Sequence, residues 1–191
     1  MSGRLATDLR RAIAADEIVP WFQPLVELRT GRLAGFEVLA RWRHTVRGLV
    51  HPSAFIPVAE QCGLVGALTQ RILSRACQAA SAWPEHLSLS VNLSPLQLSD
   101  RALPAQLRAL VEETGFPFPR LVFEVTESVL ISNHVVARSV AQALKAMGAG
   151  LALDDFGTGY ANMAQLRGLP FDRLKIDASL VRLMCDQREY R

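Results

Sequence analysis

The chain contains about six segments in which apolar and polar residues alternate, or in which a short apolar run is bounded by turn residues, and this pattern predicts β-strands. The predicted strands cover residues 19–28, 33–42, 87–93, 121–127, 151–155 and 173–177. Apolar residues at helical spacing predict helices over residues 4–16, 52–61, 67–83, 105–113, 135–147, 161–167 and from 178 onward. Residues 44–51 are expected to form a polar loop. Strands that alternate with helices favour an α/β fold with a parallel sheet.

Polar side chains recur at or near the ends of successive predicted strands. They are Glu37, Asn92, Glu124, Asp154 with Asp155, and Lys175. A (β/α) barrel builds its site from the ends of many strands at one rim, so this layout favours a barrel. A doubly wound open sheet, the alternative, would place its ligand mainly at one switch point.

The strand at residues 151–155 ends in two adjacent carboxylates, Asp154 and Asp155, and a glycine loop follows directly. Two carboxylates beside a buried strand are costly unless a positive charge balances them. A divalent cation with oxygen ligands would supply that charge. In the strand at 33–42, Glu37 and Arg41 share one face, and a simple ion pair between them is the structural alternative.

Composition narrows the class of protein further. The chain has 191 residues, of which 50% are hydrophobic, and this is enough for one domain with a sizeable core. A net charge of +3 without a basic run does not favour binding to a nucleic acid polymer, although a small phosphate-bearing ligand is compatible. The three cysteines are widely spaced, which favours a reducing cytoplasm, and no apolar segment is long enough to span a membrane. The four histidines are expected in loops or at the surface.

Five motifs carry a resemblance to a known family. They are Glu37-Val-Leu-Ala-Arg-Trp, Val91-Asn-Leu-Ser, Phe123-Glu-Val-Thr-Glu-Ser, Asp154-Asp-Phe-Gly-Thr-Gly-Tyr and Leu174-Lys-Ile-Asp. In this order they resemble the bacterial EAL domain family, which is named for a Glu-Ala-Leu motif. Here the signature has Val38 at its middle position, on the strand face opposite Glu37, and this departure should be tolerated. The resemblance covers the chain from about residue 19 onward.

The resemblance implies a TIM-like (β/α)8 barrel that hydrolyses cyclic di-GMP to linear pGpG with Mg²⁺ or Mn²⁺, in a two-metal site. It also implies a cytoplasmic homodimer that acts in bacterial second-messenger signalling. On this basis residues 1–191 form a single EAL domain that is incomplete at its carboxyl end, with roughly the last two β/α units absent. The family's Ala-Glu-Gly-Val-Glu and Gln-Gly-Tyr motifs have no counterpart, and the first of them carries a glutamate that serves the metal site.

The resemblance also assigns roles to single residues. Four would be metal ligands: Glu37, Asn92, Glu124 and Asp154. Asp155 would bind or bridge a second metal, and Lys175 would position the attacking water or stabilise charge at the phosphate. Glu127 would anchor the loop at 156–160. The nucleotide would contact Gln23, Leu39 and Arg41, and Asp177 would support the lysine motif.

Other interpretations of single motifs are weaker. Asp155-Phe-Gly157 echoes a kinase magnesium motif, but the accompanying kinase motifs are missing. Gly157-Thr-Gly159 echoes a dinucleotide loop, but Asn162 stands where the third glycine belongs. Glu124 and Glu127 could instead be exposed acids at a capped helix start.

Two hypotheses about function follow. The first is a cyclic di-GMP phosphodiesterase domain whose 191 residues alone are expected to be inactive. The second is a non-catalytic cyclic di-GMP receptor or a protein-interaction module. Exchange of strands between two copies could complete the barrel in a dimer.

Overall fold

The computed structural model describes residues 2–127, 134–157 and 168–186. Its strands are β1 (Ile18–Val26), β2 (Leu33–His44), β3 (Gly48–Val50), β4 (Ser88–Asn92), β5 (Leu121–Thr126), β6 (Gly150–Phe156) and β7 (Arg173–Ile176). Its helices are α1 (Ser2–Ala14), α2 (Pro52–Gln61), α3 (Val65–Ala80), α4 (Pro95–Leu98), α5 (Leu103–Thr114), α6 (His134–Ala146) and α8 (Ala178–Asp186), with a 3-10 turn η1 (Phe118–Arg120) before β5.

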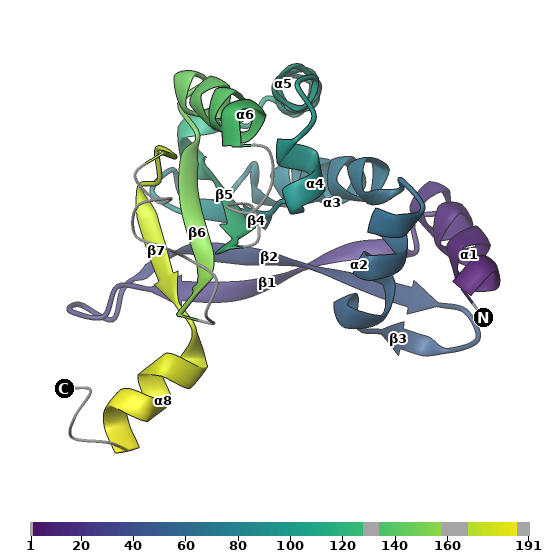
Figure 1. The fold of residues 1–191 in the computed structure, drawn as a ribbon, viewed down its shortest axis with the longest axis horizontal. Coiled ribbons are helices and arrows are strands. Elements are labelled where there is room, and N and C mark those ends of the chain that lie inside the picture. Colours follow the sequence, from purple (N-terminus) through teal and green to yellow (C-terminus); the bar gives the residue numbers. More distant parts are fainter. Residues whose placement is uncertain (1, 128–133, 158–167, 187–191) are drawn as a thin grey trace.

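The strands form one sheet in the order β1-β2-β4-β5-β6-β7, and β3 pairs with β2. β1 and β2 form a long antiparallel ribbon, whereas β2, β4, β5, β6 and β7 are parallel to one another. Among the described strands, β1 and β7 therefore lie at the two edges of the sheet (Figure 1). The parallel strands and the intervening helices agree with the α/β pattern expected from the sequence.

The core lies between the parallel strands and the helices that connect them. The middle of β4 and nearly all of β5 are buried, as expected for central parallel strands. The largest fully buried side chains include Trp42 on β2, Phe55 on α2 and Phe123 on β5. In Figure 1, α5 and α6 lie side by side on one side of the sheet, and α8 extends away below β7.

The predicted polar loop at 44–51 is wrong in part. β2 continues to His44, and Gly48–Val50 forms the short strand β3, which pairs back onto β2. Three residues are too few to show alternation, so the pattern could not indicate this strand. His44 is also buried rather than a surface residue: its Nδ1 accepts hydrogen bonds from the backbone N–H of Val46 (3.0 Å) and of Arg47 (3.3 Å).

Helix α4 was missed, although the sequence carries a signal for it. Ser94 caps this helix, and Gln97 closes a capping box by accepting from the backbone N–H of Ser94 at 3.1 Å. The helix predicted at 161–167 lies outside the described residues. Within the described part of the chain, no helix has both the length and the apolar character needed to cross a membrane.

Candidate functional site

Three carboxylates from three strands meet on one face of the sheet. Glu37 of β2, Glu124 of β5 and Asp154 of β6 each place an oxygen within 4.8 Å of the others. Lys175 of β7 lies among them, and its Nζ contacts Glu124 Oε2 at 2.5 Å, Asp154 Oδ2 at 3.0 Å and Glu37 Oε2 at 3.1 Å. We call these four residues the acidic cluster.

The register of the parallel strands explains why these side chains meet. Glu37 stands opposite Ser90 of β4, Asn92 opposite Glu124, and Thr126 opposite Asp154. Side chains two residues apart on a strand share a face, so Ser90 and Asn92 connect Glu37 to Glu124 across β4. The cluster residues therefore lie far apart in the sequence because long βαβ connections join the parallel strands that carry them.

Burial and charge set the protonation of the cluster. Burial raises the pKa of Glu124, and the Lys175 ammonium offsets part of that rise. Burial would lower the pKa of Lys175, but its hydrogen bonds and charge contacts with Glu124, Asp154 and Glu37 outweigh this and hold the pKa above its ordinary value. Lys175 is therefore a cation at neutral pH.

The donor set fits a divalent metal ion. Ionised, three carboxylates and one ammonium sum to −3 + 1 = −2, which a single divalent cation would balance. Asn92 lies beside them and donates from Nδ2 to Glu37 Oε1 at 3.1 Å, so an amide group is also within reach. Carboxylate and amide oxygens suit Mg²⁺ or Mn²⁺ better than softer metals.

Asp155 lies apart from the group of three carboxylates. Its backbone has φ of 56°, in the left-handed region, and the pairing of β6 with β7 is irregular between Leu153 and Phe156. This break in the strand gives Asp155 a different direction from that expected for a regular strand. Burial, followed by the negative charges of Asp154 and Asp177, raises the pKa of Asp155.

Glu127 is buried immediately after β5. Its Oε1 accepts a hydrogen bond from the backbone N–H of Gly157 at 2.9 Å, which fixes the start of the loop that follows β6. Gly157 has φ of 103°, which L side chains rarely adopt, and an added Cβ would lie 2.8 Å from Leu180 Cδ2, so a substitution here would strain the backbone. Residues 158–160 of this loop lie outside the described residues. Because Glu124 and Glu127 are both buried, the alternative of exposed acids at a helix start is wrong.

Asp177 begins α8 rather than joining the cluster. Its Oδ1 accepts hydrogen bonds from the backbone N–H of Ser179 at 2.8 Å and from the Ser179 hydroxyl. These two hydrogen bonds hold the pKa of Asp177 below its usual range. The residue therefore fixes the helix that follows the lysine strand.

The three expected nucleotide contacts lie along the β1–β2 ribbon. Gln23 stands directly opposite Glu37, and Leu39 stands opposite Trp21. The guanidinium of Arg41 lies over the ring of Trp21, 5.3 Å from its centroid, and donates to the carbonyl of Ala40. Among the described residues no ion pair joins Arg41 to Glu37, so the simple ion-pair alternative is wrong.

A polar network next to this ribbon was missed by sequence reasoning. Ser94 Oγ donates to Glu60 Oε1 at 2.6 Å, and Gln97 Oε1 accepts from Thr69 Oγ1 at 3.1 Å. The network fixes the segment after Asn92. It borders a cavity of about 560 Å³ that Leu39 and Asn92 also line. The capping box at residues 94–97 was the available signal.

The fold and the site define an α/β protein with a lysine-bridged acidic cluster on its parallel sheet. The chain belongs to the EAL domain family, because the sequence model of the EAL domain matches residues 6–191. The predicted family and the predicted α/β fold of the EAL type are thus confirmed.

Relatives of known sequence are longer proteins. An uncharacterized signaling protein of Caulobacter vibrioides is 45% identical over 177 residues, which are 93% of this chain and 22% of that protein. The cyclic di-GMP phosphodiesterase PdeR of Escherichia coli is 36% identical over 181 residues, covering 93% of this chain and 27% of PdeR. The chain spans less than a third of the length of these two relatives.

Solved structures share the fold closely. The PaMucR phosphodiesterase in complex with c-di-GMP matches at 32% identity and a TM-score of 0.88, over 98% of this chain and 77% of that chain. The FimX EAL domain from Pseudomonas aeruginosa bound to c-di-GMP matches at 26% identity and a TM-score of 0.87, over 97% of this chain and 76% of the other.

Proposed function

We propose that this EAL domain binds cyclic di-GMP and serves its metal-dependent hydrolysis to linear pGpG in bacterial second-messenger signalling. The observation that carries the proposal is the acidic cluster: three carboxylates and a lysine, gathered from four strands. The similarity to PdeR and to the PaMucR phosphodiesterase supports the same substrate class.

In this proposal Glu37, Asn92, Glu124 and Asp154 hold Mg²⁺ or Mn²⁺, and Asp155 serves a second ion. Bound divalent ions would supply a nucleophile near neutral pH and neutralise charge at the phosphodiester. Lys175 carries its positive charge to the same place, where it would position the attacking water or stabilise charge at the phosphate. Asp177 supports Lys175 by starting the next helix, and Glu127 holds the first residue of the loop after β6.

The nucleotide is proposed to lie along the β1–β2 ribbon. Arg41 offers a guanidinium to a phosphate oxygen, with Trp21 packed against its other side. Gln23 and Leu39 would contact the rest of the nucleotide, since both lie on the same ribbon as Glu37. We also propose a cytoplasmic homodimer, in keeping with the free thiols of Cys62 and Cys77 and with the family resemblance.

One observation favours a second candidate function, a receptor that binds cyclic di-GMP without hydrolysing it. Lys175 already bridges all three carboxylates, so the cluster has an internal counter-charge. A cluster whose negative charge is partly offset in this way can stand beside a bound nucleotide without a metal ion.

The test incubates the chain with cyclic di-GMP and Mn²⁺, follows pGpG by chromatography, and measures the binding of each ligand by calorimetry. Formation of pGpG that is lost in Glu37→Gln and Asp154→Asn supports hydrolysis, and both variants should lose Mn²⁺ binding. Unchanged Mn²⁺ affinity in both variants would overturn the ligand assignment. Asp16→Asn is the matched control, because it removes a carboxylate outside the cluster at a left-handed position that Asn tolerates. Binding of cyclic di-GMP without product supports the receptor.

A further inference from the structure

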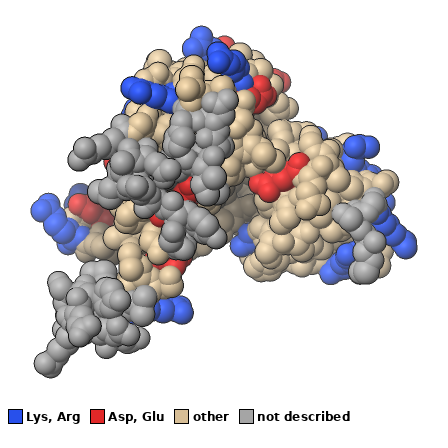
Figure 2. Space-filling model, in the orientation of Figure 1, with Lys and Arg blue, Asp and Glu red and all other residues tan. Residues whose placement is uncertain are grey.

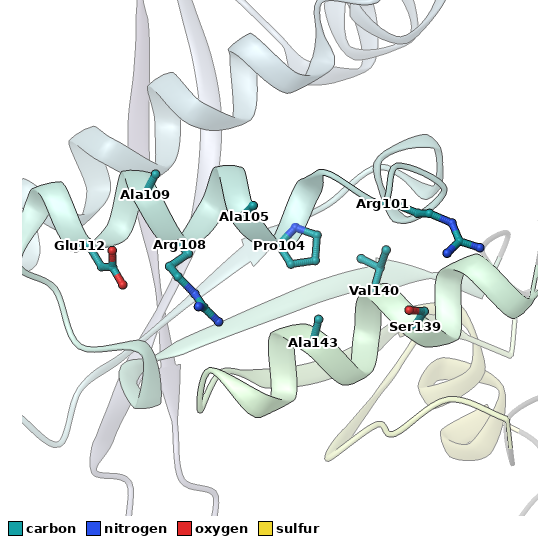
Figure 3. A pocket seen from close by; sticks show the side chains of 9 residues that line it. All are labelled: Arg101, Pro104, Ala105, Arg108, Ala109, Glu112, Ser139, Val140 and Ala143. Carbon is teal, nitrogen blue, oxygen red and sulfur yellow. The ribbon is translucent and has the colours of Figure 1, made fainter.

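A groove runs between α5 and α6, and none of the cluster residues lines it. It encloses about 530 Å³ and is lined by Arg101, Pro104, Ala105, Arg108, Ala109, Glu112, Ser139, Val140 and Ala143 (Figure 3). Figure 2 shows basic and acidic side chains gathering at the top of the molecule, over these two helices. The groove is therefore a charged surface separate from the proposed catalytic site.

Two guanidiniums in this groove have no carboxylate partner. Within the described residues, neither Arg101 nor Arg108 forms an ion pair, and both side chains are exposed. Arg108 Nε donates to the thioether sulfur of Met147 at 3.3 Å, which directs the guanidinium toward the end of α6. Glu112 lies one turn beyond Arg108 but does not pair with it. The positive charges thus remain available to a ligand.

Three of the lining residues form one stripe on α5. Ala105, Arg108 and Glu112 follow each other at intervals of three and four, so they lie along one face of the helix. Arg101 lies in the turn just before α5 and adds a second guanidinium to the groove (Figure 3). A helix that carries acidic residues on one face would match both guanidiniums.

Small side chains from both α5 and α6 form the floor of the groove. Ala105 and Ala109 lie one turn apart on α5, and Ser139 and Ala143 lie one turn apart on α6. Short side chains let the backbone of a third helix come close to both helices. Charged side chains at the edge and small residues in the floor are together suited to binding a helix.

We propose that the α5–α6 groove docks an amphipathic helix of a partner protein that carries acidic residues on the face turned toward Arg101 and Arg108. A second copy of this chain is a poorer occupant, because the groove offers one carboxylate, Glu112, for two arginines. The exposed face of α1 also carries an arginine, Arg10.

The experiment uses three fluorescent helical peptides with Glu, Gln or Lys along one face, and measures binding to the chain by anisotropy. The Glu peptide should bind at least tenfold more tightly than the Gln peptide, and added salt should weaken it. Arg101→Glu/Arg108→Glu should lose this binding by about tenfold and should prefer the Lys peptide. Arg10→Glu/Arg138→Glu, which makes the same change of net charge outside the groove, should bind the Glu peptide like the unmodified chain.

A second variant tests the groove without changing any charge. Ala105→Phe fills the exposed floor of the groove, so it should fold normally and block the Glu peptide. Equal affinity for the Glu and Gln peptides, or unchanged binding in the double reversal, would overturn the proposal. A dimer in sedimentation that the double reversal dissociates would also overturn it, in favour of a second copy.

Discussion

At the level of single residues, Lys175 sets the charge balance of the acidic cluster. One ammonium contacts carboxylates from β2, β5 and β6, and its side chain is only 29% exposed. A divalent cation that binds the same carboxylates would compete with this ammonium for their charge. Metal binding is therefore coupled to the contacts of Lys175 with the carboxylates. Removal of the lysine should change the metal affinity as well as the stability of the fold.

We predict that Lys175→Met lowers the free energy of unfolding by about 2 kcal/mol in chelator, since three carboxylates lose their partner in a partly buried place. Mn²⁺ should then raise the melting temperature of this variant more than that of the unmodified chain, because binding to the folded state alone stabilises it. Lys145→Met is the matched control, since Lys145 pairs with Asp172 outside the cluster. Equal Mn²⁺ shifts in all three proteins would contradict the coupling.

The buried thiol of Cys77 makes stability depend on pH in the alkaline range. Burial raises the pKa of Cys77 to about 11 from an ordinary 9.0, although Thr114 and Arg120 act against it. The folded state keeps its proton while the unfolded state loses it, so this contribution is complete below pH 9 and is lost as the pH rises to about 11. The loss should be about 2–3 kcal/mol.

Denaturant unfolding at a series of pH values measures this effect as the difference between the unmodified chain and Cys77→Ala. That difference should shrink between pH 9 and 11. Cys62→Ala, which removes an exposed thiol, should follow the unmodified chain throughout. A constant difference between the unmodified chain and Cys77→Ala would show that the thiol titrates alike in both states.

At the level of secondary structure elements, the sequence predicted where strands and helices lie better than how they end. The apolar patterns placed each parallel strand and, with the strands, the three carboxylates and Lys175. The expectation that Glu37 lies at a strand end is wrong, because β2 continues for seven residues beyond it, to His44. They could not give the left-handed conformation of Asp155, because an irregular pairing between two strands depends on tertiary contacts. The burial of His44 also depended on a distant element, since Asp8 of α1 lies 3.8 Å from its Nε2.

Gly35 shows how closely β2 and β4 approach each other. Gly35 stands opposite Ser88, and an added Cβ would collide with the backbone and the hydroxyl of that residue. We predict that Gly35→Ala destabilises the protein by about 2 kcal/mol, because overpacking forces the strands apart. Gly66→Ala is the matched control: Gly66 lies in α3 with nothing within 4 Å, so alanine should stabilise by about 0.5–1 kcal/mol. Thermal melts of both variants that show the same sign would contradict this account.

On the scale of the whole molecule, the sheet has a well-buried centre and a weaker edge. β5 is buried along nearly its whole length, whereas β7 has exposed Leu174 and Ile176 and pairs, among the described strands, with β6 alone. Lys175 is the residue of β7 that reaches across the sheet to the other strands. The cluster therefore ties this edge to the centre as well as forming the site.

Amide hydrogen exchange can measure directly how much Lys175 stabilises β7 at the edge of the sheet. Amides of β4 and β5 should exchange slowest, and those of β7 and α8 fastest, because local opening follows burial. Lys175→Met should speed exchange in residues 173–186 by roughly tenfold, which corresponds to about 1.4 kcal/mol of local stability, and should leave β4 and β5 nearly unchanged. Lys145→Met should instead act on the start of β6, since the Lys145 partner Asp172 accepts from the backbone N–H of Leu151 at 2.8 Å. A uniform rise across all strands in Lys175→Met would mean that the lysine stabilises the fold globally rather than holding its edge.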